Sequence, residues 1–265
     1  MKKLKGDSLT VLFYHASDPF ECPDGLPRMI YYFGDSIWLP TAVFDGKDPQ
    51  IGGGQQAFSI YETMYNLHME INTPGVLSVQ VEYDSSTRDG AIVAAFTSVD
   101  QISQADLHFR YAITESHKYH EWQNLDSLHF IVRDMLPDHM GVPFSINQGE
   151  TVVDTQSFHI DTEWVDRNCE LAVFVQSDQD TTVLITNSLP LYRSHVSGDA
   201  NGDRVVTVSD AVFLTNYIFF GGPGPLPSAS GDPNEDCVID VQDVNYLISY
   251  LYHGGPSPLP GCEID

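Results

Sequence analysis

The residues of this sequence best suited to chemistry are oxygen-bearing side chains that recur at fixed intervals near the C-terminus. In two copies they occupy positions 1, 3, 5, 9 and 12 of a twelve-residue loop, and position 7 offers a backbone carbonyl. The first copy consists of Asp199, Asn201, Asp203, Val205, Thr207 and Asp210. The second consists of Asp232, Asn234, Asp236, Val238, Asp240 and Asp243. A tight loop that turns hard oxygens inward from alternate residues suits calcium, so we predict these residues as ligands of two Ca²⁺ ions.

These loops, which have the spacing of an EF-hand, belong to a longer internal repeat with a period of 33 residues. Gly198–Asp203 returns as Gly231–Asp236, and the Gly-Gly-Pro at 221–223 returns at 254–256. Apolar residues at helical spacing follow each loop, so we expect two amphipathic helices that end at these glycines. The sequence before each loop is too short, or too rich in proline and glycine, for an entering helix.

A duplicated calcium loop followed by a single helix resembles the type I dockerin family, over about residues 196–265. Dockerins are calcium-dependent modules that dock onto cohesin domains in extracellular assemblies, so the resemblance implies a cohesin-like or cell-surface protein as partner. The sequence departs from the family at position 6, where Arg204 and Cys237 replace the usual glycine. Positions 10 and 11, with which dockerins often read cohesins, are usually polar but here are Val208-Ser209 and Val241-Gln242. An alternative stays open, in which calcium only stabilises the module and there is no partner.

The four cysteines are Cys22, Cys169, Cys237 and Cys262, and none forms a C-x-x-C pair. This spacing excludes a zinc ribbon or a dithiol redox motif within the sequence as given. Cys237 and Cys262 both lie in the repeated region, and the extracellular setting that the dockerin resemblance implies favours a disulfide between them. Two unpaired thiols are the alternative.

The composition restricts the possible partners. The sequence has 37 acidic and 12 basic residues and a formal net charge of -25, which opposes binding to nucleic acid or anionic membranes. No apolar run approaches the roughly 18 residues of a membrane-spanning helix, so we expect no transmembrane segment. We find no signal peptide in the sequence as given, but the dockerin resemblance implies an extracellular or cell-surface protein.

The middle of the chain, residues 73–190, alternates between apolar and polar residues with a period of two. Turn residues separate about seven strand candidates, which predict an immunoglobulin-like β-sandwich. The candidates are Val79–Tyr83, Ala91–Thr97, Leu107–Thr114, Leu128–Arg133, Thr155–Ile160, Cys169–Gln176 and Thr182–Thr186. Histidines are dense at His117–Glu121, which we interpret as a solvated loop because the fixed helical geometry of an H-E-x-x-H metal site is missing.

The first 72 residues indicate part of a thioredoxin-like fold. A buried-strand pattern at Leu9–Tyr14 precedes a short helix within Asp18–Gly34 and an amphipathic helix at Gln55–Ile71. Between the helices, Pro40-Thr41 opens a strand and resembles the cis-proline segment of thioredoxin folds. This order, followed by a sandwich, resembles the outer-membrane-protein-28-related family over about residues 1–190. In that family a thioredoxin-like domain precedes such a sandwich.

A thioredoxin-like oxidoreductase needs a cysteine at a helix N-terminus just after its first strand, where the helix dipole lowers the thiol pKa. The chain starts too late to contain that strand and helix, so we expect the domain to be truncated at its N-terminus. Cys22 lies beyond this position, beside acidic residues that we expect to raise its pKa.

We therefore expect an α+β multidomain protein. Its parts are a partial thioredoxin-like domain at 1–72, a β-sandwich at 73–190, a linker at 191–197 and a small all-α calcium-binding module at 198–265. We expect a secreted, non-catalytic protein whose dockerin-like tail attaches the body to a surface or an extracellular complex. Two alternatives remain: a thiol oxidoreductase whose C-x-x-C lies in missing upstream sequence, and a component of a polysaccharide-degrading complex.

Overall fold

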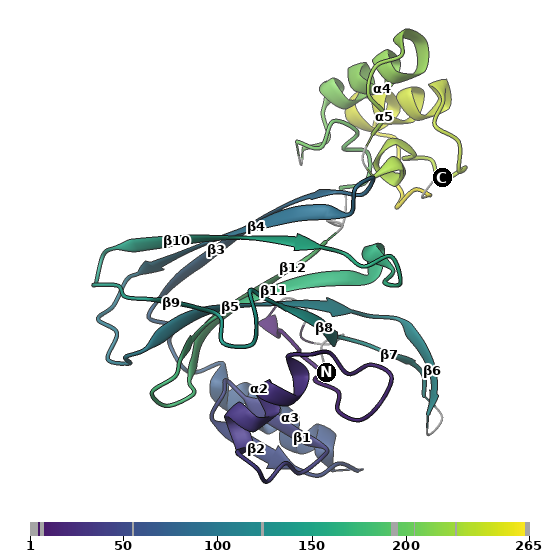
Figure 1. Cartoon of the computed structure of the whole chain (residues 1–265). Coiled ribbons are helices and arrows are strands. Elements are labelled where there is room, and N and C mark those ends of the chain that lie inside the picture. The colour runs from purple at the N-terminus through teal and green to yellow at the C-terminus, as the bar shows by residue number, and fades with distance from the viewer. Residues whose placement is uncertain are drawn as a thin grey trace. The chain divides into compact units, whose positions relative to one another are not determined.

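The computed structural model describes residues 5, 8–54, 56–122, 125–191, 196–203, 205–225 and 227–262, with backbone alone for 121, 122, 125 and 126. The chain forms two compact units, Met1–Tyr192 and Arg193–Asp265 (Figure 1). The boundary expected between residues 72 and 73 lies inside the first unit and stays a prediction. The expected linker falls mainly on residues outside those described.

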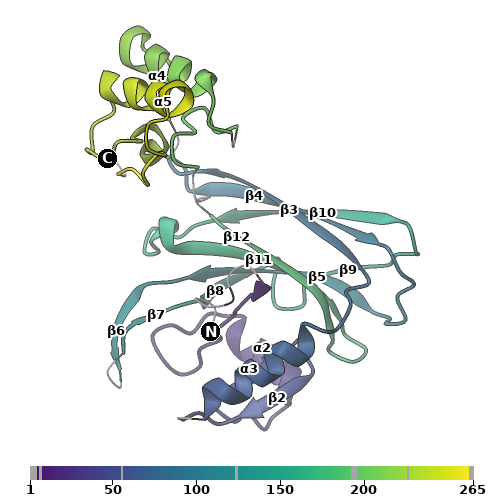
Figure 2. The same ribbon diagram turned by 180° about the vertical axis from the view of Figure 1, so that it is seen from behind.

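The first unit is built around two antiparallel sheets that face each other, which confirms the expected β-sandwich (Figures 1 and 2). One sheet has the order β10-β4-β3 and comprises β3 (Gly75–Asp84), β4 (Asp89–Ser98) and β10 (Thr151–His159). The other has the order β12-β11-β5-β8, with β9 also paired to β5. It comprises β5 (Leu107–Glu115), β8 (Ile131–Leu136), β9 (Val142–Phe144), β11 (Cys169–Ser177) and β12 (Val183–Pro190). A short 3-10 helix, η2 (Asp166–Asn168), leads into β11.

The second sheet is buried on both faces. Toward the first sheet it contributes Phe109, Tyr111 and Leu171 to the main core, where they meet Phe96 of β4. From its other face, Ala112 and Phe174 join a second cluster with Cys22 of the N-terminal segment. All nine residues of β5 are consequently buried, as in a strand that is covered on both faces of its sheet.

The N-terminal segment contains the two helices expected of a partial thioredoxin-like fold, with a β-hairpin between them where the sequence predicts a single strand. Helix α2 (Gly25–Phe33) precedes the hairpin of β1 (Thr41–Phe44) and β2 (Asp48–Ile51), and α3 (Ala57–His68) follows. The peptide bond between Leu39 and Pro40 is cis, as the sequence predicts.

The prediction of a strand at Leu9–Tyr14 was wrong. Phe13 forms only an isolated parallel bridge to Ile131, through backbone hydrogen bonds to Phe130 (2.8 Å) and Val132 (2.9 Å). The apolar run has another origin, because Leu12 and Tyr14 pack on the outer face of the second sheet while Phe13 is exposed.

The interpretation of His117–Glu121 as a loop was also wrong. Most of this segment belongs to β6 (Lys118–Trp122), which pairs with β7 (Leu125–Leu128) in a separate hairpin. The polar composition hid the strand because the hairpin leaves polar and aromatic side chains accessible, as with Tyr119, which is exposed.

A buried polar cluster fixes α2 to the outer face of the second sheet. The guanidinium of Arg28 is fully buried and donates to the side-chain oxygens of Tyr32 (2.7 Å) and Gln176 (2.8 Å). Arg110 donates to the same Gln176 oxygen (3.0 Å) and to Asp178 (2.7 Å). Hydrogen bonds of this kind offset the cost of burying two cations.

The second unit is a pair of helices with irregular connections. Helices α4 (Val208–Phe220) and α5 (Val241–His253) pack through Leu214 and Leu247, both fully buried, and a 3-10 helix, η3 (Ser228–Gly231), precedes the second loop. Each helix ends at a left-handed glycine, Gly221 or Gly254, as the Gly-Gly-Pro repeats predict. Within the described residues, every helix falls short of the length and apolarity needed to span a bilayer.

The difference in burial between Leu171 and Leu67 predicts that truncating each leucine lowers the free energy of unfolding by a different amount. Leu171→Ala removes a fully buried side chain from between the sheets, and we expect a loss of about 2–5 kcal/mol in the free energy of unfolding. Leu67→Ala on α3, where the leucine is 54% exposed, should cost less than about 0.5 kcal/mol.

Urea titration followed by tryptophan fluorescence measures both variants, because Trp38, Trp122 and Trp164 all lie in the first unit. Equal losses for the two variants would contradict this assignment of the core.

Candidate calcium-binding site

The helices begin inside the loops, so the residues at loop positions 9 and 12 also start a helix. Thr207 is the N-cap of α4: its side chain accepts from the Ser209 N–H (3.2 Å), and Asp210 Oδ2 accepts from the Thr207 N–H (2.8 Å). In the second loop, Asp240 accepts from the Gln242 N–H (2.6 Å) and donates its own N–H to Asp243 Oδ2 (2.8 Å). Both are capping boxes, with a carboxylate at the third helical position.

The first loop is closed by backbone N–H groups that donate to its own side chains. Asp199 Oδ1 accepts from Gly202 (2.9 Å) and Asp203 (3.0 Å), and Asn201 Oδ1 accepts from Asp203 (2.9 Å). Asp203 Oδ1 accepts from Val205 (2.9 Å). The Asn201 N–H donates to Asp210 Oδ1 (3.1 Å), which links the start of the loop to its twelfth position.

The second loop repeats most of this pattern 33 residues later. Asp236 donates its N–H to Asp232 Oδ1 (3.2 Å) and to Asn234 Oδ1 (2.9 Å), and Asp236 Oδ1 accepts from Val238 (3.0 Å). The side chains of Val205 and Val238 are about half exposed, as suits residues that offer only a backbone carbonyl. Position 6 of this loop, Cys237, is left-handed at φ 65°, and its counterpart Arg204 lies outside the described residues.

The carboxylates at the first and last loop positions are buried. Asp199, Asp210, Asp232 and Asp243 are each at most 4% exposed. Burial raises the pKa of Asp243 to about 6, and the nearby carboxylates of its loop add to this shift. Burial likewise raises the pKa of Asp210. Negative charge is thus unfavourable in both loops unless a cation neutralises it.

One buried oxygen provides the direct test of whether these residues fit a cation. Within the described part of the chain, Asp243 Oδ1 has no hydrogen-bond donor. Calcium takes six to eight oxygen ligands, and a carboxylate oxygen without a donor is a ligand that it accepts. The residues present therefore fit calcium, which would supply the charge that the buried carboxylates lack; the individual ligand assignments stay predictions.

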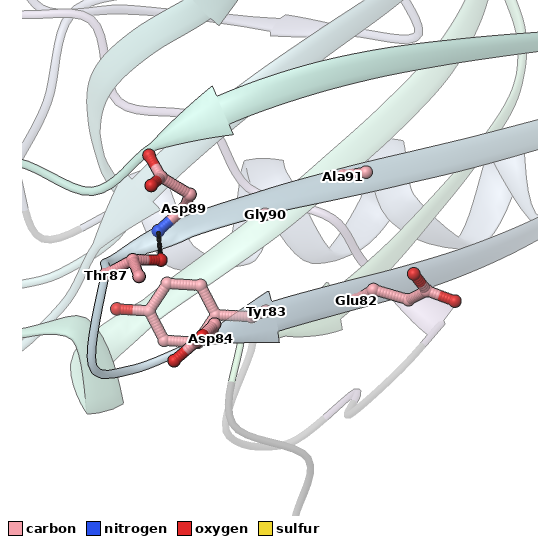
Figure 3. A pocket seen from close by; sticks show the side chains of 7 residues that line it. All are labelled: Glu82, Tyr83, Asp84, Thr87, Asp89, Gly90 and Ala91. Carbon is pink, nitrogen blue, oxygen red and sulfur yellow. Dashed lines mark hydrogen bonds between the residues drawn. The ribbon is translucent and has the colours of Figure 1, made fainter.

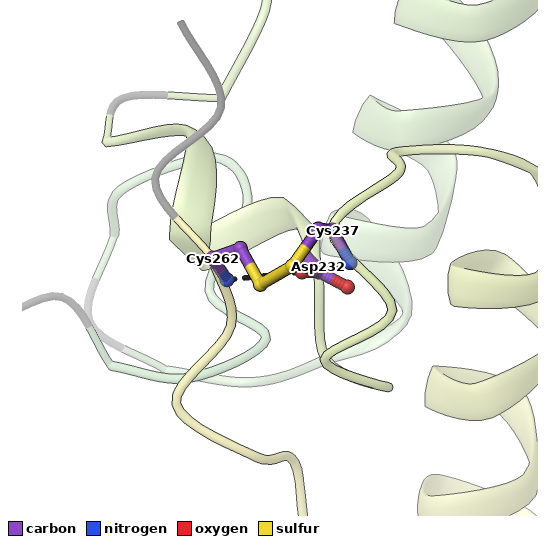
Figure 4. A group of neighbouring side chains, drawn as sticks. All are labelled: Asp232, Cys237 and Cys262. Carbon is purple, nitrogen blue, oxygen red and sulfur yellow. Dashed lines mark hydrogen bonds between the residues drawn. A yellow bond between two sulfur atoms is a disulfide. The ribbon is translucent and has the colours of Figure 1, made fainter.

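The predicted disulfide between Cys237 and Cys262 is confirmed, and it lies against the second loop (Figure 4). Asp232 Oδ2 accepts from the N–H groups of both cysteines, at 3.1 Å from Cys237 and 2.9 Å from Cys262. Neither contact with Asp232 was predicted from the sequence. The only signal for the Cys262 contact was that Cys262 pairs with a cysteine inside the loop.

The two remaining cysteines are buried free thiols. Burial is the main cause that raises the pKa of Cys22, and the carboxylates of Asp24 and Asp134 add to it. From the sequence, the neighbouring acids alone were expected to raise the pKa of Cys22. Burial raises the pKa of Cys169 to about 12. A thiol with a raised pKa is a weak nucleophile at neutral pH.

A second candidate site is a shallow pocket of about 420 Å³ at the turn between β3 and β4 (Figure 3). Its lining residues are Glu82, Tyr83, Asp84, Thr87, Asp89, Gly90 and Ala91. Hydrogen bonds from Ser86 lower the pKa of Asp84, and a hydrogen bond from His159 lowers that of Asp89. These exposed acids are therefore ionised and already partnered, as in a solvated turn.

Comparison with known proteins supports the assignment of the second unit. The family model of the dockerin type I domain matches residues 197–252, which confirms the dockerin resemblance of this part of the chain. No curated protein has significant sequence similarity to the chain.

Two solved structures from Porphyromonas gingivalis are similar to the chain. HBP35 has a TM-score of 0.55 at 12% identity, over 68% of this chain and 62% of that chain. A domain of the outer membrane lipoprotein Omp28 has a TM-score of 0.33 at 11% identity, over 44% of this chain and 88% of that chain. The chain thus spans 62% of the HBP35 structure, and the similarity to HBP35 concerns the fold. The expected fold class, an α+β body with a small helical dockerin-like module, is confirmed.

The loop geometry predicts that one aspartate decides calcium binding at the second loop. Asp243→Ala removes the buried carboxylate at position 12, and we expect the calcium stoichiometry of the full chain to fall by one ion. Glu235→Ala is the matched control, because it removes one negative charge from an exposed, non-ligand position of the same loop. Isothermal titration calorimetry measures both variants. An unchanged stoichiometry in Asp243→Ala would show that the ligand assignment is wrong.

Proposed function

We propose that this protein is a secreted or cell-surface attachment protein without catalytic activity. Calcium orders the C-terminal module, and the ordered module docks the first unit onto a cohesin-like protein. The observation that carries the proposal is the pair of loops with buried carboxylates at equivalent positions, within a segment that matches the dockerin type I model. The match to a dockerin model supports a cohesin-like partner and an extracellular setting.

Two further observations support parts of this proposal. Disulfides persist in oxidising compartments, so the bond between Cys237 and Cys262 favours an extracellular location. The non-catalytic role is supported by the burial and raised pKa of both free thiols, Cys22 and Cys169, which make them poor nucleophiles.

The surface of the module favours a partner with an apolar docking face. Val208 and Val241 occupy the tenth position of the two loops, and they are 45% and 47% exposed at the starts of α4 and α5. Exposed apolar residues at equivalent places in both repeats leave matched patches that a complementary apolar surface can cover. We therefore propose that the partner reads these valines by apolar contact, where other dockerins use polar residues.

A binding experiment with the full chain tests the proposal. Immobilised cohesin domains should retain the calcium-loaded protein and release it in EDTA. The double variant Val208→Glu/Val241→Glu should bind at least about tenfold more weakly, a loss of about 1.4 kcal/mol, because it places charge in an apolar interface. Its calcium affinity, measured by calorimetry, should change little.

Val153→Glu is the control, since this valine is 60% exposed on β10 of the first unit. It should bind cohesin domains as the unmodified protein does. Failure of the calcium-loaded protein to bind any cohesin domain would reject the docking role and leave calcium as a stabiliser of the module alone.

A further inference from the structure

The segment Leu259–Cys262 lies against the second calcium loop. The Leu259 N–H donates to the Pro233 carbonyl (3.0 Å), and the Cys262 N–H donates to Asp232 Oδ2 (2.9 Å). Gly261 adopts a left-handed φ of 75°, and a Cβ atom there would lie 2.1 Å from the Ala229 carbonyl oxygen of η3 and 2.9 Å from the Asp232 carbonyl oxygen of the loop. Only glycine permits so close an approach, so this segment is fitted to the loop.

The segment acts on the loop through Asp232, the first ligand position. This carboxylate is fully buried, and both of its oxygens accept backbone hydrogen bonds. Oδ1 accepts from Asp236 within the loop, whereas Oδ2 accepts from Cys237 and Cys262. The Cys262 donor comes from 30 residues further along the chain, and it helps to fix the orientation of the carboxylate.

The disulfide holds this donor in place. It joins Cys262 to Cys237, which stands between two predicted ligand positions, Asp236 and Val238. The bond ties the segment covalently to the loop, so the Cys262 N–H cannot move far from Asp232 while the disulfide is intact. In the first loop the equivalent residue is Arg204, so that loop has no disulfide at this position.

We propose that the segment Leu259–Cys262 is a positioning element of the second calcium site, held there by the Cys237–Cys262 disulfide, and that the affinity of the second loop alone depends on this bond. The inference rests on the proposed calcium function of the loops. Partners that orient a metal-binding carboxylate change metal affinity by about 10- to 100-fold when they are lost. Opening the disulfide should therefore weaken the second loop by about this factor and leave the first loop unchanged.

The bond opens by exchange with a dithiol reductant. A reductant thiolate attacks one sulfur of the bond, which forms a mixed disulfide and releases the other cysteine as a thiolate. The second thiol of the reductant then attacks the reductant's own sulfur in the mixed disulfide and releases the remaining cysteine. The two electrons reduce the Cys237–Cys262 bond to two thiols, and the reductant becomes a cyclic disulfide.

Calorimetry on full-length variants with one working loop tests the inference. Asp210→Ala leaves only the second loop, and Asp243→Ala leaves only the first. Each variant is titrated with calcium with and without dithiothreitol. We expect reduction to raise the Kd of the second loop by about 10- to 100-fold and to change the Kd of the first loop by less than about twofold. Equal Kd values before and after reduction, or equal losses in both loops, would overturn the inference.

A second variant distinguishes the effect of the segment on calcium affinity from the effect of backbone strain at Cys237. Cys237→Gly/Cys262→Ser removes the bond but places glycine at the left-handed position of the loop. We expect the Kd of the second loop to stay raised in this variant, because the C-terminal segment is no longer held. A return to the Kd of the oxidised protein would show that the segment is not needed, and would overturn the inference.

Hydrogen exchange on the unmodified chain gives a second readout that requires no variant of a ligand. Opening the disulfide with dithiothreitol should lower the calcium-induced protection of residues 229–245 and leave the protection of residues 197–212 unchanged. The oxidised arm distinguishes the two proposals: if the oxidised chain binds no calcium at all, the proposed function fails. If it binds calcium as well after reduction as before, only the present inference fails.

Discussion

Buried carboxylates without a neutralising charge are the constraint on which the C-terminal module depends. Asp210 and Asp243 each sit at the third position of a helix, where their backbone hydrogen bonds help to start α4 and α5. Both are fully buried beside other acids of the same loop. A negative charge is favourable at a helix N-terminus but unfavourable in a desolvated acidic loop. A divalent cation held by these carboxylates would reconcile the two demands, because it would remove the repulsion and leave the capping hydrogen bonds in place.

In this arrangement, metal binding at the loops would be coupled to helix packing. The helices that the loops start are those that bury Leu214 and Leu247 against each other, so an ordered loop and a packed helix pair support one another. A cluster this small contributes little burial on its own, and small domains of this size commonly rely on a metal or a disulfide. The module has two loops that fit a metal ion, and it contains one disulfide, Cys237–Cys262.

The features encoded locally were predictable from the sequence. The 33-residue repeat gave the loops, both helices and their glycine ends, because each is set by residues within a few positions of one another. Features that depend on distant contacts were not. The segment Leu9–Tyr14 has the pattern of a strand, but its partner Ile131 lies far along the chain and offers only one bridge. The contact of Cys262 with Asp232 likewise depends on how the tail folds back, which no local pattern encodes.

Hydrogen exchange on the full chain, with and without calcium, tests the central claim most directly. The account predicts that calcium protects both loops together with α4 and α5, while exchange in the β-sandwich of the first unit stays the same. Magnesium at the same concentration should protect much less, because it dehydrates reluctantly and demands a stricter octahedral geometry. Exchange that calcium leaves unchanged, or that magnesium slows equally, would contradict the account.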